Sequence, residues 1–260
     1  MVIKVLCIET LFNDYPFEDR FYLTKKHGFD YIEFWSWIDK DISRIKELCD
    51  INNLNITAFS GDQSYSLLDK SEQDNYITFV KKSIEIAKYL NSNCLVLHSN
   101  PLDNSGNVLK TYDYIDNDIK ILNIIDTLKA LAPIAEDTGI LLLLEPLNSI
   151  IDHPGNFLTH TEDSVKIIEA VGSPNIKILY DIYHMQIMEG NLINTIKKYV
   201  NITGHIHIAD VPGRHEPGTG EINYNNIFKC LNSINYDSTV GFELFPLYST
   251  EKALNTIRTL

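Results

Sequence analysis

The sequence has little cysteine, and the cysteines it has are scattered along the chain. Cys7, Cys49, Cys94 and Cys230 form no C-x-x-C pair, so neither a zinc ribbon nor a disulfide framework is indicated. We expect four reduced thiols, most of them buried.

Positive charge is also scarce. The chain has 22 Lys and Arg against 35 Asp and Glu, which gives a formal net charge of -13. Affinity for nucleic acid depends on cationic surface that neutralises phosphates, so this balance argues against DNA or RNA as a partner.

Long apolar runs are missing as well. No stretch approaches the roughly 20 residues that span a bilayer. The N-terminal MVIKVLCIET is too short for a signal peptide and is interrupted by Lys4 and Glu9. The sequence therefore predicts a cytoplasmic protein without a membrane partner.

The chain is rich in short apolar runs that alternate with helical patterns, and no linker, composition shift or low-complexity segment interrupts them. Eight apolar runs, each followed by a helical pattern, favour a single (β/α)₈ barrel domain over residues 1–260, in preference to an open doubly wound sheet. The predicted strands are 2–8, 29–35, 54–60, 94–99, 140–145, 175–181, 202–209 and 239–244. The predicted helices are 17–28, 39–53, 72–90, 114–138, 162–171, 183–199 with a break at Gly190, 224–231 and 251–260.

Each of the last four predicted strands has an acid or a histidine at or near its end: Glu145, Asp181, His207 and Glu243. In such a barrel the C-terminal strand ends converge, and three carboxylates brought together repel one another unless a cation lies among them. Oxygen ligands with one imidazole suit Mg²⁺, Mn²⁺ or Co²⁺ better than a structural zinc. The alternative for any one acid is that it caps the next helix or forms an ion pair.

Five segments carry a resemblance to a known family: LLLEPLN, DHPGNFLTH, LYDIYHMQIMEGNLI, GHIHIADVPGRHEPGTGEINY and GFELFP. They resemble the hydroxypyruvate isomerase family, one of the xylose isomerase-like TIM barrels, which also include ketose 3-epimerases and the endonuclease IV type. The resemblance is close from Glu145 to about Pro246 and loose in the N-terminal half.

The resemblance implies that Glu145 and Glu243 are the catalytic acid/base pair and that both bind a metal together with Asp181 and His207. It also implies that His184 and Arg214 hold substrate oxygens. One position departs from the pattern, because hydroxypyruvate isomerases commonly have Gln where this chain has His207, as ketose 3-epimerases do.

The activity implied is isomerisation of a small hydroxy-carbonyl compound, hydroxypyruvate to tartronate semialdehyde (2-hydroxy-3-oxopropanoate), by glutamate-mediated proton transfer through a metal-bound enediolate. The cofactor would be one divalent ion, Mg²⁺ or Mn²⁺ with Co²⁺ as a further candidate, and no organic cofactor. The alternatives are a ketose 3-epimerase, a 2-oxo-tetronate isomerase, an abasic-site endonuclease of the endonuclease IV type, and a barrel that binds sugar without turnover. The sequence does not determine the metal or the oligomeric state, and a homo-oligomer is one of the alternatives.

Further residues near the predicted site have two readings each. His184 would either reach the pocket or start a helix, and Arg214 would either reach it or pair with Glu216 or Glu221. His98 would line the pocket or be a satisfied core residue.

Three more residues, and one loop, lie near the same strand ends. His205, two residues before His207 and on the same strand face, is expected to contact the metal ligands or to lie in the core, in preference to binding the metal itself. Trp35 and Trp37 would wall the pocket or pack under a loop. The polar segment 100–111 is a candidate lid or substrate loop.

Overall fold

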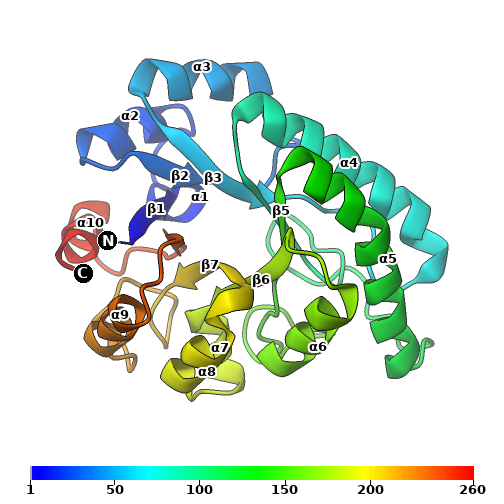
Figure 1. The fold of residues 1–260 in the computed structure, drawn as a ribbon. Coiled ribbons are helices and arrows are strands. Elements are labelled where there is room, and N and C mark those ends of the chain that lie inside the picture. The colour runs from blue at the N-terminus through cyan, green and yellow to red at the C-terminus, as the bar shows by residue number, and fades with distance from the viewer. Residues whose placement is uncertain (1) are drawn as a thin grey trace.

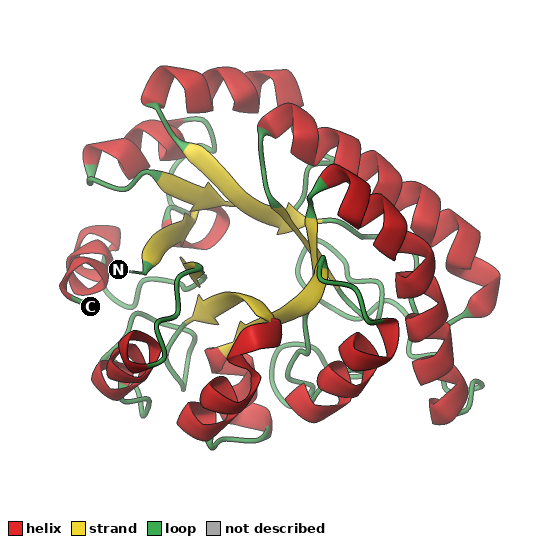
Figure 2. Ribbon diagram, viewed as in Figure 1, coloured by secondary structure: helices red, strands yellow, loops and turns green. Residues whose placement is uncertain are grey.

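The computed structural model describes residues 2–260 and is a closed barrel of eight parallel strands in sequential order, surrounded by helices (Figures 1 and 2). β1 pairs with β8, so the ring has no open edge. The predicted (β/α)₈ architecture is confirmed. The strands are β1 (Ile3–Cys7), β2 (Tyr31–Glu33), β3 (Asn55–Ser60), β4 (Cys94–Leu97), β5 (Leu141–Leu144), β6 (Ile176–Asp181), β7 (Thr203–Ile208) and β8 (Thr239–Phe242).

The helices follow the predicted alternation, with the sixth divided at Gly190 as expected. The short helix that continues directly from β1 was not predicted. The helical segments are α1 (Ile8–Leu11), α2 (Asp19–Lys26), α3 (Ile42–Asn52), η1 (Lys70–Glu72), α4 (Gln73–Leu90), α5 (Asn117–Thr138), α6 (Thr161–Val171), α7 (Ile182–Met188), α8 (Leu192–Tyr199), η2 (Val200–Ile202), α9 (Tyr224–Ser233) and α10 (Thr250–Thr259).

Alternate residues of the strands divide into two apolar clusters, because successive strand side chains point to opposite faces. On β4, Leu95 and Leu97 join the large core between barrel and helices, whereas Cys94 and Val96 join a small separate cluster. That cluster also takes residues from β3, β5 and β6, and it fills one side of the barrel interior. The other side, towards β2, β7 and β8, holds buried polar groups instead.

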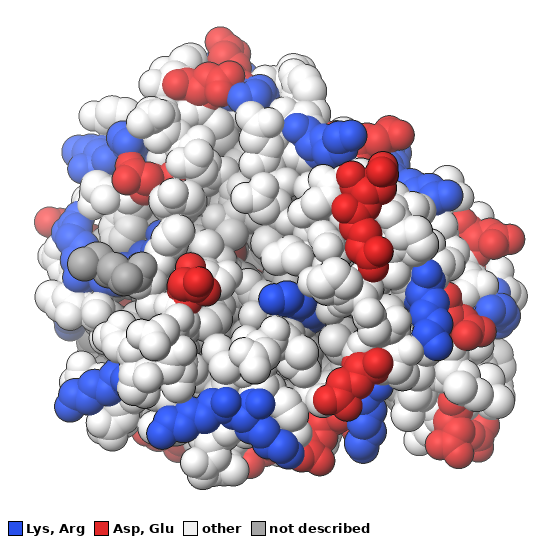
Figure 3. Space-filling model, in the orientation of Figure 1, with Lys and Arg blue, Asp and Glu red and all other residues white. Residues whose placement is uncertain are grey.

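The four cysteines are buried and unpaired. None of the helices between residues 2 and 260 combines the length and apolar character that a membrane span needs. On the face shown in Figure 3, acidic and basic side chains are interspersed among uncharged ones.

Candidate active site

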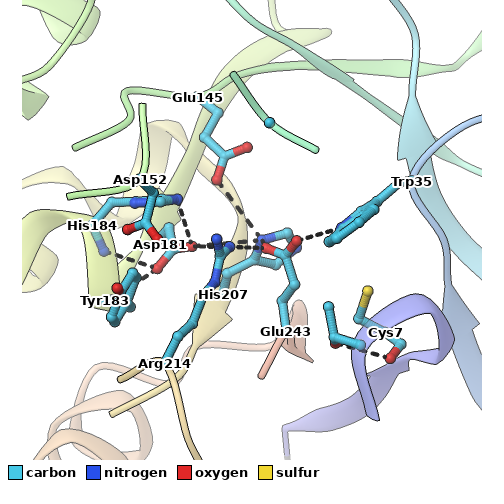
Figure 4. Close-up of polar contacts among 12 residues, drawn as sticks. Cys7, Trp35, Glu145, Asp152, Asp181, Tyr183, His184, His207, Arg214 and Glu243 are labelled. Carbon is cyan, nitrogen blue, oxygen red and sulfur yellow. Dashed lines mark hydrogen bonds and ion pairs between the residues drawn. The ribbon is translucent and has the colours of Figure 1, made fainter. Parts of the chain in front are cut away.

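The four residues predicted at the ends of strands β5 to β8 lie together at one end of the barrel (Figure 4). All four side chains are buried. His207 Nδ1 lies 3.2 Å from Glu243 Oε2, 3.8 Å from Glu145 Oε1 and 4.0 Å from Asp181 Oδ2. Their convergence is a fact of the structure, and the roles assigned to them remain predictions.

These side chains fit a divalent cation. Asp181, His207 and Glu243 offer ligand atoms that all lie within 4.8 Å of one another. Glu145 Oε1 and His207 Nδ1 are buried without a hydrogen-bond partner. Such orphaned atoms are costly unless a positive group satisfies them. A set of carboxylates with one imidazole is the donor chemistry that Mg²⁺ and Mn²⁺ accept.

Asp181 answers a question that the sequence left open. Its Oδ1 accepts hydrogen bonds from the backbone N–H groups of Tyr183 (2.7 Å) and His184 (3.2 Å), so it caps α7. Its Oδ2 faces His207. Helix capping and membership of the site are therefore not exclusive for this residue.

Arg214 reaches into the site. Its Nη2 lies 2.6 Å from Glu243 Oε2 and 3.7 Å from Asp181 Oδ2, so the alternative pairing with Glu216 or Glu221 is wrong. Arg214 has a left-handed φ of 56°. The loop around it is shaped by Asp210, whose buried carboxylate accepts hydrogen bonds from four backbone N–H groups.

The carboxyls respond differently to this environment. Burial by itself would raise the pKa of Glu243, but Arg214, His207 and the Trp35 hydrogen bond together hold that pKa well below its usual range. For Asp181, burial outweighs the attraction of Arg214, and the pKa is raised. Neighbouring carboxyls whose pKa values are pushed apart are a recurrent feature of acid/base sites.

The site opens into a cavity of about 410 Å³. This volume is in the range of small-molecule sites. Leu102 to Gly106, from the segment predicted as a lid or substrate loop, lie along its wall. The volume admits either a three-carbon acid or a hexose, so size alone does not select the substrate.

The family model described as xylose isomerase-like TIM barrel matches residues 21–260. Hydroxypyruvate isomerase of Escherichia coli (strain K12) is 35% identical over 258 residues, and the match covers 95% of each chain. This chain belongs to the hydroxypyruvate isomerase family of xylose isomerase-like TIM barrels. This relative and a 2-oxo-tetronate isomerase that also matches over nearly the full length are both named isomerases, and the chain is an isomerase.

Three further matches extend over nearly the full length of the chain. A 2-oxo-tetronate isomerase of Cupriavidus necator is 28% identical over 260 residues, covering 96% of this isomerase and 95% of the relative. The crystal structure of an AP endonuclease, family 2, from Brucella melitensis superposes with a TM-score of 0.90 at 28% identity and covers 100% and 99% of the two chains. A D-psicose 3-epimerase structure has a TM-score of 0.80 at 20% identity, with 99% and 98% covered, and shows likeness of fold.

The two tryptophans of the isomerase divide between their two readings. Trp35 lines the cavity, and its indole Nε1 donates a 2.6 Å hydrogen bond to Glu243 Oε1. Trp37 instead donates to Ser83 Oγ at 3.0 Å and stacks on Phe79. Only Trp35 therefore touches the site.

His98 lines the cavity and connects the site to a carboxylate that the sequence analysis did not identify. Its Nε2 lies 3.3 Å from Glu145 Oε2, and its Nδ1 lies 3.0 Å from Asp62 Oδ1. Burial alone would lower the pKa of His98, but Asp62 and Glu145 raise it to about 10. Asp62 follows β3 by two residues, so the rule that flagged the later strand ends would have found it.

Glu33, the last residue of β2, is a second buried carboxylate that was missed. Its Oε2 lies 3.0 Å from His205 Nε2, and its Oε1 lies 3.4 Å from His207 Nε2. His205 is fully buried and also contacts Thr239 Oγ1 at 2.6 Å, which agrees with the core position expected for it. Burial would raise the pKa of Glu33, but His207 and His205 lower it to about 2.

His184 is fully enclosed and lines the cavity. Its Nε2 lies 3.5 Å from Asp181 Oδ2. Burial and the nearby Arg214 lower its pKa well below the usual range, so the ring is neutral. The pocket reading of this histidine therefore fits the structure, although it also lies in the first turn of α7.

Proposed function

We propose that this isomerase interconverts hydroxypyruvate and tartronate semialdehyde, with Glu145 and Glu243 moving a carbon-bound proton between adjacent carbons of an enediolate. The observation that carries the proposal is that both glutamates line one cavity beside His207, at 3.8 Å and 3.2 Å from its Nδ1. The 35% identical hydroxypyruvate isomerase supports the choice of reaction. We take residues 1–260 to act as one domain.

Glu145, Asp181, His207 and Glu243 would hold the metal, with Mg²⁺ or Mn²⁺ favoured by the oxygen-rich donors and Co²⁺ as a third candidate. A bound divalent ion would supply Lewis acidity that polarises the substrate carbonyl and so acidifies the neighbouring C–H.

The chain itself orients both glutamates. Trp35 and Arg214 hold the two oxygens of Glu243, while His98 holds Oε2 of Glu145 and leaves its Oε1 without a hydrogen bond. Carboxylates whose orientation is fixed in this way are already positioned for transfer of the carbon-bound proton. General acid/base catalysis requires such positioning.

Arg214 argues for a substrate with a carboxylate. Its guanidinium presents a planar fork that matches carboxylate geometry, and it lines the cavity beside Glu243. A three-carbon keto acid could place its carboxylate against Arg214 and its carbonyl and hydroxyl towards the acids.

Two other substrates have specific support. A 2-oxo-tetronate carries the same carboxylate, and an enzyme named for that reaction is 28% identical over nearly the whole chain. A ketose 3-epimerase reaction is favoured by His207 in the position where hydroxypyruvate isomerases commonly have Gln.

Proton exchange distinguishes these readings. The protein is stripped with a chelator, reloaded with Mg²⁺ or Mn²⁺, and incubated in D₂O with hydroxypyruvate, a 2-oxo-tetronate or D-fructose, and deuterium is located by NMR. We expect exchange at C3 of hydroxypyruvate that depends on the added metal and is lost in Glu145→Gln and in Glu243→Gln. Exchange with the ketose alone would transfer the assignment to an epimerase, and the absence of exchange with every compound would refute both.

A further inference from the structure

His207 and His184 each face a carboxylate of the site, and they do so through different ring atoms. His207 turns Nδ1 towards Glu243, whereas His184 turns Nε2 towards Asp181. A histidine can bind a metal only through a bare nitrogen, and it can donate a hydrogen bond only through a protonated one. The protonation of His184 is therefore decisive for what it can do.

Asn148 determines that protonation. It is fully buried, and its side-chain oxygen accepts hydrogen bonds from the backbone N–H groups of Ile151 and Asp152, both at 3.0 Å. Because a backbone N–H can only donate, the atom between these two groups has to be the amide oxygen. The other end of the side chain is then the NH₂ group, and the usual ambiguity of an amide is resolved by its neighbours.

The NH₂ group of Asn148 has two partners. It lies 2.5 Å from Asp152 Oδ2 and 2.7 Å from His184 Nδ1. An amide nitrogen donates and does not accept, so His184 Nδ1 has to present its lone pair to it. An imidazole ring whose Nδ1 is bare carries its proton on Nε2, which here is the atom that faces Asp181 (Figure 4).

We propose that Asn148 is a positioning residue that holds His184 as the Nε2–H tautomer, so that His184 donates a hydrogen bond to a substrate oxygen and does not bind the metal. His184, Glu145 and Asp181 have ligand atoms close enough to share an ion, and the contact with Asn148 removes His184 from that set. The hydrogen bond from His184 to a substrate oxygen rests on the proposed function, whereas the assignment of the tautomer does not depend on it.

Swapping the side chains of Asn148 and Asp152 tests the tautomer assignment without changing the net charge. In the double variant N148D/D152N, the pair can still hydrogen-bond to each other, and the side chain at 148 can still accept from both backbone N–H groups. The group facing His184 Nδ1, however, becomes a carboxylate oxygen, which demands a proton on Nδ1. The single variant Asp152→Asn is the matched control, since it leaves the Asn148 donor in place.

The readout is the ¹⁵N chemical shift of the ring nitrogens in protein labelled with ¹⁵N-histidine, assigned with the variant His184→Gln. We expect the Nε2–H tautomer in the wild type and in Asp152→Asn, and the Nδ1–H tautomer in N148D/D152N. Addition of Mg²⁺ alone should leave the Nε2 proton of His184 in place. A wild-type Nδ1–H tautomer, an imidazolium, or loss of that proton on Mg²⁺ binding would overturn the proposal.

Turnover provides the second measurement. For a substrate that shows C3 exchange, the double variant should lose about 10- to 100-fold in the exchange rate relative to Asp152→Asn, the effect of losing one strong hydrogen bond. An unchanged rate together with a changed tautomer would refute the donor role of His184. Absence of exchange in the wild type would refute the proposed function and leave the tautomer assignment standing on the NMR data.

Discussion

The indole of Trp35 and the carboxylate of Glu243 share a 2.6 Å hydrogen bond that joins the chain after β2 to the chain after β8. These strands flank β1, so the bond spans three strands of the barrel mouth. It fixes one oxygen of Glu243 while Arg214 fixes the other. Two fixed oxygens leave the carboxylate a single orientation towards the cavity.

Trp35→Phe keeps the aromatic surface and removes the N–H donor. We expect a loss of about 10- to 100-fold in kcat/KM, because a hydrogen bond to a charged group contributes about 1.5–3 kcal/mol. Trp37→Phe is the matched control, since Trp37 donates to Ser83 outside the cavity and should change stability without changing turnover. Equal loss of turnover in the two variants would contradict the role given to Trp35.

Arg214→Gln removes the charged partner proposed for the substrate carboxylate. It should raise KM for hydroxypyruvate about 30-fold or more, because removing one partner of a buried charge pair costs about 2–5 kcal/mol. Arg214→Lys keeps the charge but not the planar fork, so its KM should lie between that of the wild type and that of Arg214→Gln. Steady-state kinetics with an acidic and a neutral substrate provide the measurement. If KM rises equally for the acidic and the neutral substrate, Arg214 does not bind a substrate carboxylate.

Gly241 leaves room for the buried pair of Glu33 and His205. A Cβ at this position would lie 2.3 Å from Glu33 Oε1 and 2.8 Å from His205 Nε2. Gly241→Ala should therefore destabilise the protein by about 1–3 kcal/mol, as overpacking does. Urea unfolding of Gly241→Ala, Glu33→Ala and the double variant measures the coupling. Because truncation of Glu33 removes the clash, the double variant should lose less than the sum of the two, and strict additivity would contradict the predicted clash.

The buried thiols should make stability fall at alkaline pH. Burial and then Glu33 raise the pKa of Cys94 from 9.0 to about 12. Above pH 9 the unfolded chain therefore releases a proton that the folded chain keeps, and the stability due to this thiol is lost as pH rises from about 9 to about 12. The slope is about -1.4 kcal/mol per pH unit for one such thiol.

Urea unfolding between pH 8 and pH 11 provides the measurement for Cys94. The variant Cys94→Ala is less stable at every pH, but its stability should fall less steeply above pH 9. Parallel curves for the variant and the wild type would show that the folded and unfolded chains release the Cys94 proton alike.

The sequence by itself determined the barrel and the end of it that carries the site. Apolar strands that each end in an acid or histidine are local patterns, and parallel strands in a closed ring necessarily bring those ends together. Glu145, Asp181, His207 and Glu243 could be grouped for that reason without any knowledge of contacts. The strand ends at Glu33 and Asp62 obeyed the same rule and were missed because it was applied only to the last four strands.

Only the tertiary structure decided which side chains hold one another. Trp35 and Glu243 are 208 residues apart, and Glu33 and His205 are 172 apart, so no spacing in the chain predicts either pair. Likewise, the amide orientation of Asn148 follows from two backbone N–H groups, and the proton position on His184 follows from that amide. Strand register and side-chain rotamers set these contacts, and both arise from packing the whole barrel, whereas the alternation of strands and helices arises from each segment alone.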